Sequence, residues 1–130
     1  MTGASRGLGR AMAVALARAG ADVAVAARSK PDLEETARQV AATGRRALVV
    51  ETDVTAYAQV DALVQRTVGT LGGLHIVVNN SGIARVAPVA HMSPDDFRAT
   101  LDVNLVGVFN GCRAAAAHLI AQKAGKIINT

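Results

Sequence analysis

Short apolar runs alternate with longer helical patterns along the whole chain. The runs have the length of β-strands, are rich in valine and alanine, and do not alternate with polar residues. Such runs are typical of strands covered on both faces. Because whole helices separate them, we expect right-handed βαβ crossovers and a parallel sheet, hence a doubly wound α/β fold. The predicted strands span residues 22–27, 47–50, 74–78 and 126–129.

Start and stop signals mark the helices. Ser29 and Ser93 are predicted N-caps, each followed by a proline and an acid. We expect Pro31 at the first helical position, with Asp32 three residues after the cap. Thr55 is expected to cap another helix. The predicted helices span residues 9–19, 31–43, 56–71 and 94–122, the last apolar on most faces from 101 to 119.

Composition limits the class of function. A hydrophobic fraction of 51% excludes disorder, and the chain is long enough for one domain, residues 1–130. The net charge of +4 is spread over scattered arginines with few aromatic residues, which argues against nucleic acid as a partner. No apolar run reaches the ~18 residues of a membrane span. The single Cys112 fits a reducing compartment, so we expect a cytoplasmic protein.

Residues 2–9, Thr-Gly-Ala-Ser-Arg-Gly-Leu-Gly, stand directly before a predicted helix. Gly3, Gly7 and Gly9 allow a tight turn and a close approach of the backbone to a phosphate. The helix N-terminus then supplies N–H groups and partial positive charge. The spacing differs from that of the general dinucleotide fingerprint and from a P-loop. A glycine-rich turn without a ligand is the alternative.

A second polar segment, Asn79-Asn80-Ser81-Gly82, follows the third predicted strand. Ligands of open α/β sheets bind beyond the carboxyl ends of the strands, so this segment is a candidate binding loop. An ordinary Asn-Gly-type turn is the alternative.

Taken together, these motifs resemble those of the short-chain dehydrogenase/reductase family, and the resemblance covers nearly the whole chain. Residues 2–9 match the cofactor loop of that family, and residues 79–82 match its Asn-Asn-Ala-Gly segment with Ser81 in place of alanine. Asp53-Val54 and the segment 102–105 match two further motifs. The loop and Arg28 look most like the 3-oxoacyl-carrier-protein reductase and glucose dehydrogenase branches.

The resemblance implies a Rossmann-type sheet that is incomplete here. The glycine loop of the family follows a strand, whereas Met1 directly precedes Thr2. That strand would lie between those at 22–27 and 74–78, so both would expose unpaired backbone groups. The C-terminal third of the family's domain is also absent. We therefore expect residues 1–130 alone to aggregate or to fold only partly.

The resemblance also implies roles for particular residues. Asn104 would be catalytic, holding the water-linked proton relay behind a catalytic lysine; the alternative is a helix asparagine that bonds to backbone. Asp53 would bond the adenine amino group, and Asn80 would lie against the ribose on the nicotinamide side. The complete set of predicted cofactor ligands is Gly3, Ser5, Arg6, Gly7, Leu8, Gly9, Arg28, Ser29, Asp53, Val54, Asn79, Asn80, Ser81 and Gly82.

We expect NADP(H) rather than NAD(H) as the cofactor. Members that use NAD usually carry an acid at the end of the second family strand, and residues 25–29 contain none. Arg28 is placed to pair with a 2′-phosphate, and Arg6 can approach the same group. Two exposed arginines with no ligand are the alternative.

The catalytic tyrosine of the family is followed four residues later by lysine. The only tyrosine here, Tyr57, is followed at that distance by Asp61. We therefore expect the catalytic serine, tyrosine and lysine to be missing, the serine falling just beyond Thr130. The three histidines have no ligand spacing, so no metal site is expected. Cys112 is expected to pack in a helix.

Three functions remain open. The first is hydride transfer between a nicotinamide and a carbonyl or secondary alcohol, for example a 3-oxoacyl thioester, by a homo-oligomeric enzyme of which this chain is a part. The second is a non-catalytic NADP(H)-binding module. The third is a structural subunit that uses the helix at 102–122 for dimerisation.

Overall fold

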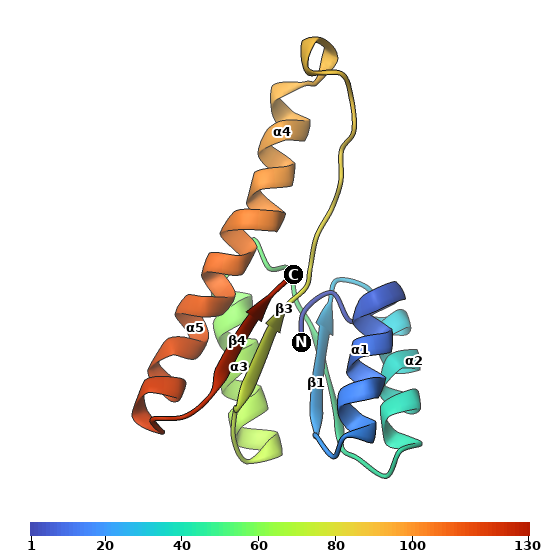
Figure 1. Ribbon diagram of the computed structural model, residues 1–130, viewed down its shortest axis with the longest axis vertical. Coiled ribbons are helices and arrows are strands. Elements are labelled where there is room, and N and C mark those ends of the chain that lie inside the picture. Colours follow the sequence, from blue (N-terminus) through green and yellow to red (C-terminus); the bar gives the residue numbers. More distant parts are fainter.

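The computed structural model describes all 130 residues. Helices and parallel strands alternate along the chain, as the apolar pattern predicts (Figure 1). The strands are β1 (Val23–Ala27), β2 (Ala47–Glu51), β3 (Ile76–Asn79) and β4 (Lys126–Asn129). The α-helices are α1 (Gly7–Arg18), α2 (Lys30–Ala41), α3 (Tyr57–Leu71), α4 (Pro94–Leu101) and α5 (Gly107–Ala121), with a short 3₁₀ turn at Val89–His91.

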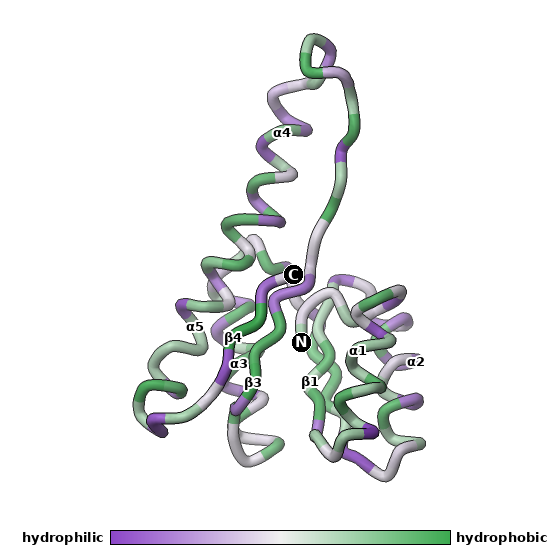
Figure 2. The backbone as a smooth tube through the Cα atoms, in the orientation of Figure 1, coloured by the Kyte–Doolittle hydropathy of each residue, from purple (hydrophilic) through white to green (hydrophobic).

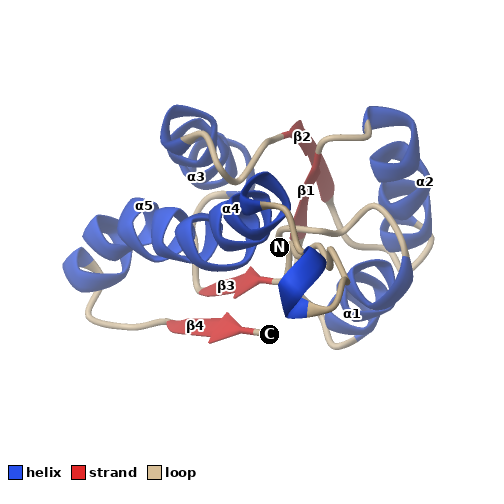
Figure 3. Cartoon of the chain, turned by 90° about the horizontal axis from the view of Figure 1, so that it is seen from above, coloured by secondary structure: helices blue, strands red, loops and turns tan.

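The four strands form two parallel pairs rather than one continuous sheet. β1 pairs with β2, and β3 pairs with β4. The chain start lies between the two pairs (Figure 3). There Thr2 forms a bridge with Ala26, and its N–H donates to the Val78 carbonyl at 3.0 Å. Residues 1–4 thus connect β1 and β3 only at the carboxyl ends of these strands.

Below this connection, a slot separates β1 from β3. A cavity of about 340 Å³ is lined by Val23, Ala24, Ile76 and Val77 among others. The expected gap between the two predicted strands is therefore present, and it is mostly apolar.

Helices cover both faces of the sheet, which confirms the doubly wound α/β class. Val23 and Val25 of β1 pack toward α1 and α2, in a core with Ala13, Leu33 and Val40. Ala24 and Ala26 point the other way and pack with Val50 and with Leu63 of α3. β1 is apolar on successive residues because each of its faces meets a helix layer.

Three local expectations were wrong. α2 begins at Lys30, so Pro31 occupies the second helical position rather than the first. Thr55 does not cap α3; the N-cap is Ala56, and the Thr55 backbone N–H and hydroxyl both donate to the Asp53 carboxylate. β3 begins at Ile76, two residues later than predicted, because it pairs only with β4.

The last helical region is continuous from α4 through a π-helical segment, Asp102–Val106, into α5. The Ser93 cap is confirmed by its bond from the Asp96 backbone N–H at 3.0 Å. α4 projects away from the rest of the molecule (Figure 1), and hydrophobic residues recur along it between hydrophilic ones (Figure 2). Its exposed large apolar side chains are Phe97, Leu101, Leu105, Val106 and Phe109.

Residues Pro94–Ala121 are long and apolar enough to cross a membrane by length and composition alone, whereas the sequence predicted no run of that kind. Core helices of soluble proteins meet the same criterion, and α5 packs on α3 and β3.

Candidate functional site

A cavity of about 540 Å³ opens where β1, β2, β3 and the start of α1 meet. Four chain segments that are distant in sequence form its wall, which is the place where open α/β sheets bind ligands. The predicted cofactor residues that line it are Gly3, Ser5, Arg6, Leu8, Gly9, Arg28, Ser29, Asp53, Val54, Asn80, Ser81 and Gly82.

The start of α1 presents free backbone donors at this cavity. No side chain caps the helix, and its first turn contains no acid. The first backbone bond runs from the Arg10 N–H to the Arg6 carbonyl at 3.3 Å, so the N–H groups of Gly7, Leu8 and Gly9 have no backbone acceptor. Such a helix start can bind an anionic group.

Two glycines of this loop are required for different reasons. Gly7 has a φ of +56°, which side chains rarely tolerate, although a Cβ there would meet nothing within 4 Å. Gly9 is required by space, because an added Cβ would lie 2.0 Å from the Gly3 carbonyl oxygen and 2.7 Å from the Asn80 amide nitrogen. The loop therefore closes tightly onto the segment after β3.

Asn80 and Thr2 make that closure. The Asn80 side-chain amide donates to the carbonyls of Thr2 and Gly3 at 3.2 and 3.3 Å. In return the Thr2 hydroxyl oxygen accepts the backbone N–H groups of Asn80 and Ser81 at 3.0 and 3.1 Å. Asn80 thus orients the glycine loop while also lining the cavity.

Arg10 and Thr36 hold the loop from the other side. The Arg10 guanidinium donates to the Ser5 carbonyl and to the Thr36 hydroxyl, and Thr36 donates to the Ala4 carbonyl at 2.8 Å. Thr36 is fully buried. Sequence reasoning missed both residues, because neither belongs to a motif and only packing brings α1 and α2 together.

The Asp53 carboxylate is held in its ionised form at one end of the cavity. Hydrogen bonds from the Thr55 backbone N–H and hydroxyl lower the pKa of Asp53, with a smaller contribution from the nearby charge of Arg28. Below it, the buried Asn110 of α5 donates its amide to the Val54 carbonyl at 2.8 Å. α5 thereby fixes the turn that carries Asp53.

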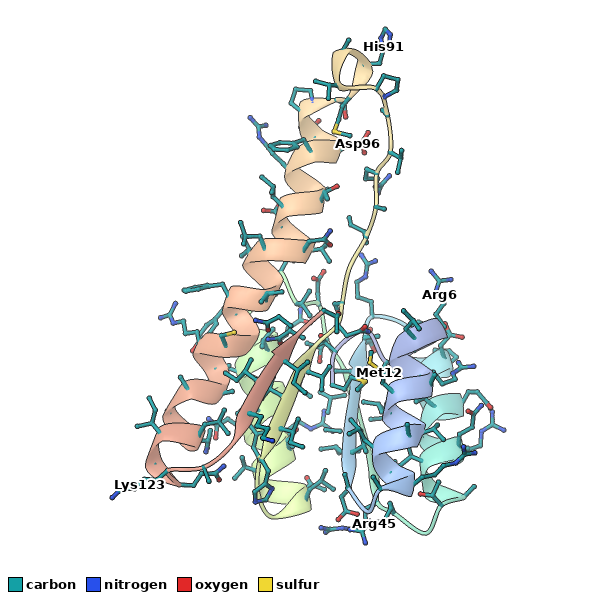
Figure 4. The ribbon with its side chains drawn as sticks, viewed as in Figure 1. Arg6, Met12, Arg45, His91, Asp96 and Lys123 are labelled. Atoms are coloured by element: carbon teal, nitrogen blue, oxygen red, sulfur yellow. The ribbon has the colours of Figure 1, made fainter.

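Arg28, Ser29 and Asp32 form the neighbouring corner of the cavity. Arg28 is exposed and Ser29 half-buried. The Ser29 hydroxyl donates to the Asp32 carboxylate at 2.6 Å. Arg6 lies at the start of α1 and lines the same cavity (Figure 4). Asp32 was predicted only as a helix-start residue and not as part of the site. Its spacing of three residues from Ser29, a predicted cofactor ligand, was the signal that could have placed it there.

Three predicted site residues do not line this cavity. Gly7 shapes the loop without lining it. Asn79 is buried and turned the other way, donating to the Asn129 side chain at 2.9 Å and lining the slot between β1 and β3. Asn104 lies just outside, at the π-helical segment.

Asn104 uses its whole side chain to hold the loop after β3. Its carbonyl oxygen accepts the Ile83 N–H and its amide donates to the Ile83 carbonyl, both at 2.9 Å. Ile83 lines the cavity together with Val103, and neither residue was predicted. In this arrangement Asn104 bonds to backbone, as the alternative interpretation of this residue expected.

The remaining candidate groups lie elsewhere. Tyr57 does not line the cavity; the Arg113 guanidinium lies over its ring at 4.4 Å. Cys112 is half-buried and unpaired in α5. No three histidine, cysteine or acidic side chains are grouped so that they could hold a metal ion.

The sequence of this chain is similar to those of known proteins. Residues 1–130 match the short chain dehydrogenase family. The chain is 37% identical over 130 residues to a 3-oxoacyl-[acyl-carrier-protein] reductase of Synechocystis sp., with 99% of this chain and 53% of that protein aligned.

The fold of this chain is also similar to those of solved dehydrogenase structures. A short-chain type dehydrogenase/reductase from Mycobacterium marinum superposes with a TM-score of 0.95 at 41% identity, covering 98% of this chain and 52% of the other. An alcohol dehydrogenase from Thermococcus sibiricus, complexed with 5-hydroxy-NADP, superposes with a TM-score of 0.92 at 30% identity, covering 98% and 55%.

The chain therefore belongs to the short-chain dehydrogenase family, whose members are oxidoreductases that bind nicotinamide cofactors. It spans about half the length of the curated relatives it matches.

Proposed function

We propose that this chain is the cofactor-binding part of an NADP(H)-dependent oxidoreductase that transfers hydride between a nicotinamide and a carbonyl or secondary alcohol. The observation that carries the proposal is the cavity itself, where an uncapped helix start with unpaired N–H groups faces Arg6 and Arg28. A dinucleotide with an additional phosphate needs both features: helix N–H groups for the pyrophosphate and arginines for the 2′-phosphate.

Each part of the cavity has a role in this proposal. The α1 start binds the pyrophosphate, Asp53 accepts the adenine amino group, and Asn80 keeps the glycine loop closed against the ribose. Asn104 holds the loop at Ile83 and thereby the nicotinamide end of the cavity. Bound nicotinamide supplies or accepts the hydride. A serine and a Tyr-x-x-x-Lys pair outside these residues would exchange the proton.

The substrate class follows from the relatives rather than from the cavity. A 3-oxoacyl-[acyl-carrier-protein] reductase is 37% identical and a (-)-trans-carveol dehydrogenase 38% identical to this chain. The first name indicates the carbonyl of a 3-oxoacyl group on a carrier protein, and the second indicates an alcohol, so a carbonyl or secondary alcohol is the proposed substrate and a 3-oxoacyl thioester is one candidate. We place the enzyme in the cytoplasm, and the unpaired Cys112 is consistent with this.

The cofactor preference is tested by fluorescence titration of the protein with NADPH and with NADH. We expect tighter binding of NADPH, and about tenfold weaker NADPH binding in Arg28→Ala, because one charge-assisted pair with the phosphate is lost. Arg18→Ala, an exposed arginine at the far end of α1, is the matched control and should change nothing. Equal or tighter binding of NADH by the unmodified protein would contradict the NADP(H) assignment.

One observation favours a second candidate function, a partner subunit or NADP(H)-binding module without its own chemistry. Phe97, Leu101, Leu105 and Phe109 recur every four residues along the continuous helical region from α4 through the π-helical segment into α5, and all are exposed. A face of this kind suits a second chain, including another copy in a homo-oligomer. Purification from the natural source distinguishes the two: a partner-subunit role predicts co-purification with a longer relative, whereas the enzyme purifies with its own activity.

A further inference from the structure

Two helices of this protein begin with the same signature, a serine N-cap and an aspartate three residues later, but the two serines bond differently. The Ser93 hydroxyl accepts the Asp96 backbone N–H at 3.0 Å and donates to the Asp96 carboxylate at 2.9 Å. The Ser29 hydroxyl donates to the Asp32 carboxylate at 2.6 Å and caps no backbone N–H. Ser29 therefore lacks the bond that normally occupies the oxygen of an N-cap serine.

The consequence is a fixed hydrogen-bond polarity at Ser29. A serine hydroxyl has one hydrogen to donate and two lone pairs that accept. The hydrogen of Ser29 is committed to Asp32, and no protein donor occupies its lone pairs. Since Ser29 and Asp32 both line the proposed cofactor cavity beside Arg28, the serine offers this corner an acceptor.

An acceptor and a carboxylate favour a different ligand from the one that two arginines favour. A ribose 2′-hydroxyl can donate to Ser29 or Asp32, as in NAD(H). A 2′-phosphate has only acceptor oxygens at neutral pH, so it bonds to Arg6 and Arg28 but is repelled by Asp32. The corner thus combines two arginines that favour NADP(H) with a serine and an aspartate that favour NAD(H).

We propose, on the basis of the cofactor site proposed above, that Asp32 is a specificity-determining residue that limits the preference for NADP(H). It acts directly, through its charge beside the 2′-position, and indirectly, by accepting the hydrogen of the Ser29 hydroxyl, whose lone pairs remain free to accept. Arg10 donates to the Asp32 backbone carbonyl at 3.3 Å, which anchors the residue at this place.

The test is Asp32→Asn, made in the natural protein that contains these residues, with dissociation constants for NADPH and NADH measured by fluorescence titration. Removing the charge should tighten NADPH binding about fivefold and leave NADH binding equal or weaker. The ratio of the two dissociation constants should therefore move in favour of NADPH. The gain for NADPH should shrink at high salt, because screening weakens the repulsion that the wild type suffers.

Asp96→Asn is the matched control. It removes the same charge from the same helical position of α4, outside the cavity, and should leave the NADPH to NADH ratio unchanged. A second variant, Ser29→Ala, removes the acceptor and should weaken NADH by about threefold more than NADPH. Circular dichroism on all variants confirms that the fold is kept.

The outcomes separate this inference from the proposed function. If the unmodified protein binds NADPH but neither Asp32→Asn nor Asp96→Asn changes its NADPH to NADH ratio, Asp32 is only a helix-start acid and the inference is wrong. A ratio that moves toward NADH also overturns it. If the unmodified protein binds neither nucleotide, the proposed function fails and takes the inference with it.

Discussion

At the scale of single residues, sequence motifs predicted which side chains meet but not which way each one faces. The neighbours Asn79 and Asn80 belong to one motif and looked equivalent. In the structure, Asn80 bonds the glycine loop, whereas Asn79 is buried against Asn129. Asn79 is the last residue of β3 and Asn80 lies in the loop that follows, and their side chains face different ways. This difference depends on the register with β4, which local sequence does not specify.

The Asp53 turn permits a prediction at this scale. The Thr55 hydroxyl supplies one of the two bonds that lower the pKa of Asp53, and the Thr55 backbone N–H supplies the other. Thr55→Val removes only the hydroxyl bond, so it should move that pKa part of the way up toward its ordinary value. A depressed carboxyl pKa stabilises the fold above the unfolded-state pKa, and this stability is lost as the pH falls through the folded-state value. The variant should therefore lose stability near neutral pH but little below the folded-state pKa.

Carbon NMR titration of the Asp53 carboxyl measures the shift directly. Thr43→Val is the control, since the Thr43 hydroxyl bonds only to the Val40 carbonyl at the end of α2. A Thr55→Val protein whose Asp53 pKa stays as low as in the wild type would show that the Thr55 hydroxyl does not contribute to the lowered pKa.

At the scale of helices and strands, periodicity and caps predicted the order of the elements and most of their bounds. The failures were at ends where tertiary contacts override local signals. Thr55 is a good cap by type, yet its hydroxyl bonds to Asp53 instead, because the turn after β2 brings the carboxylate closer. The π-helical segment at Asp102–Val106 has no sequence signal, and it lies where Asn104 holds Ile83.

Packing between α1 and its loop gives the prediction at this scale. Gly9→Ala would place a Cβ against the Gly3 carbonyl, a backbone atom that cannot turn aside. We expect a loss of about 3 kcal/mol in the free energy of unfolding and loss of NADPH binding, because the loop must open. The measurements are urea denaturation and fluorescence titration.

Gly69→Ala is the matched control for that experiment. Gly69 lies inside α3 with a normal helical φ, and an added Cβ meets nothing within 4 Å. This variant should gain about 0.5–1 kcal/mol, since alanine has the higher helix propensity. If Gly9→Ala behaved like Gly69→Ala, the close contact between the loop and α1 would not exist in solution.

At the scale of the whole molecule, the main structural feature is the slot between β1 and β3. The sequence predicted it because a glycine loop of this kind follows a strand in the resembling family. The backbone groups of Val23 and Ala24 that face the slot find one partner in the Met1 ammonium, which donates to the Ala24 carbonyl at 2.8 Å. Burial lowers the pKa of that ammonium from 8.0 to about 6. An amine whose charged form is disfavoured by burial is therefore a weak substitute for a strand at the slot.

The pH dependence of this arrangement has a definite sign. Between pH 6 and 8 the unfolded chain carries the proton and the folded chain does not, so stability rises with pH across this window and falls as the pH drops toward 6. The difference is on the order of 2–3 kcal/mol for a free Met1 amine. A thermal melt of residues 1–130 at pH 6 and at pH 8 measures it, and we expect a broad transition at both, with the lower midpoint at pH 6.

Filling the slot is the decisive experiment. Thr2 opposes Ala26 in a parallel register, so an extension of about four residues before Met1 runs opposite the unpaired part of β1. A Val-Ala-Leu-Val extension should convert the melt into a cooperative monomeric transition and abolish its dependence on pH between 6 and 8, because the ammonium leaves the slot. The same extension with a central proline cannot complete the hydrogen bonds of a middle strand and should fail. A sharp monomeric melt of residues 1–130 alone, unchanged by either extension, would mean that the slot closes by itself and that β1 and β3 need no strand between them.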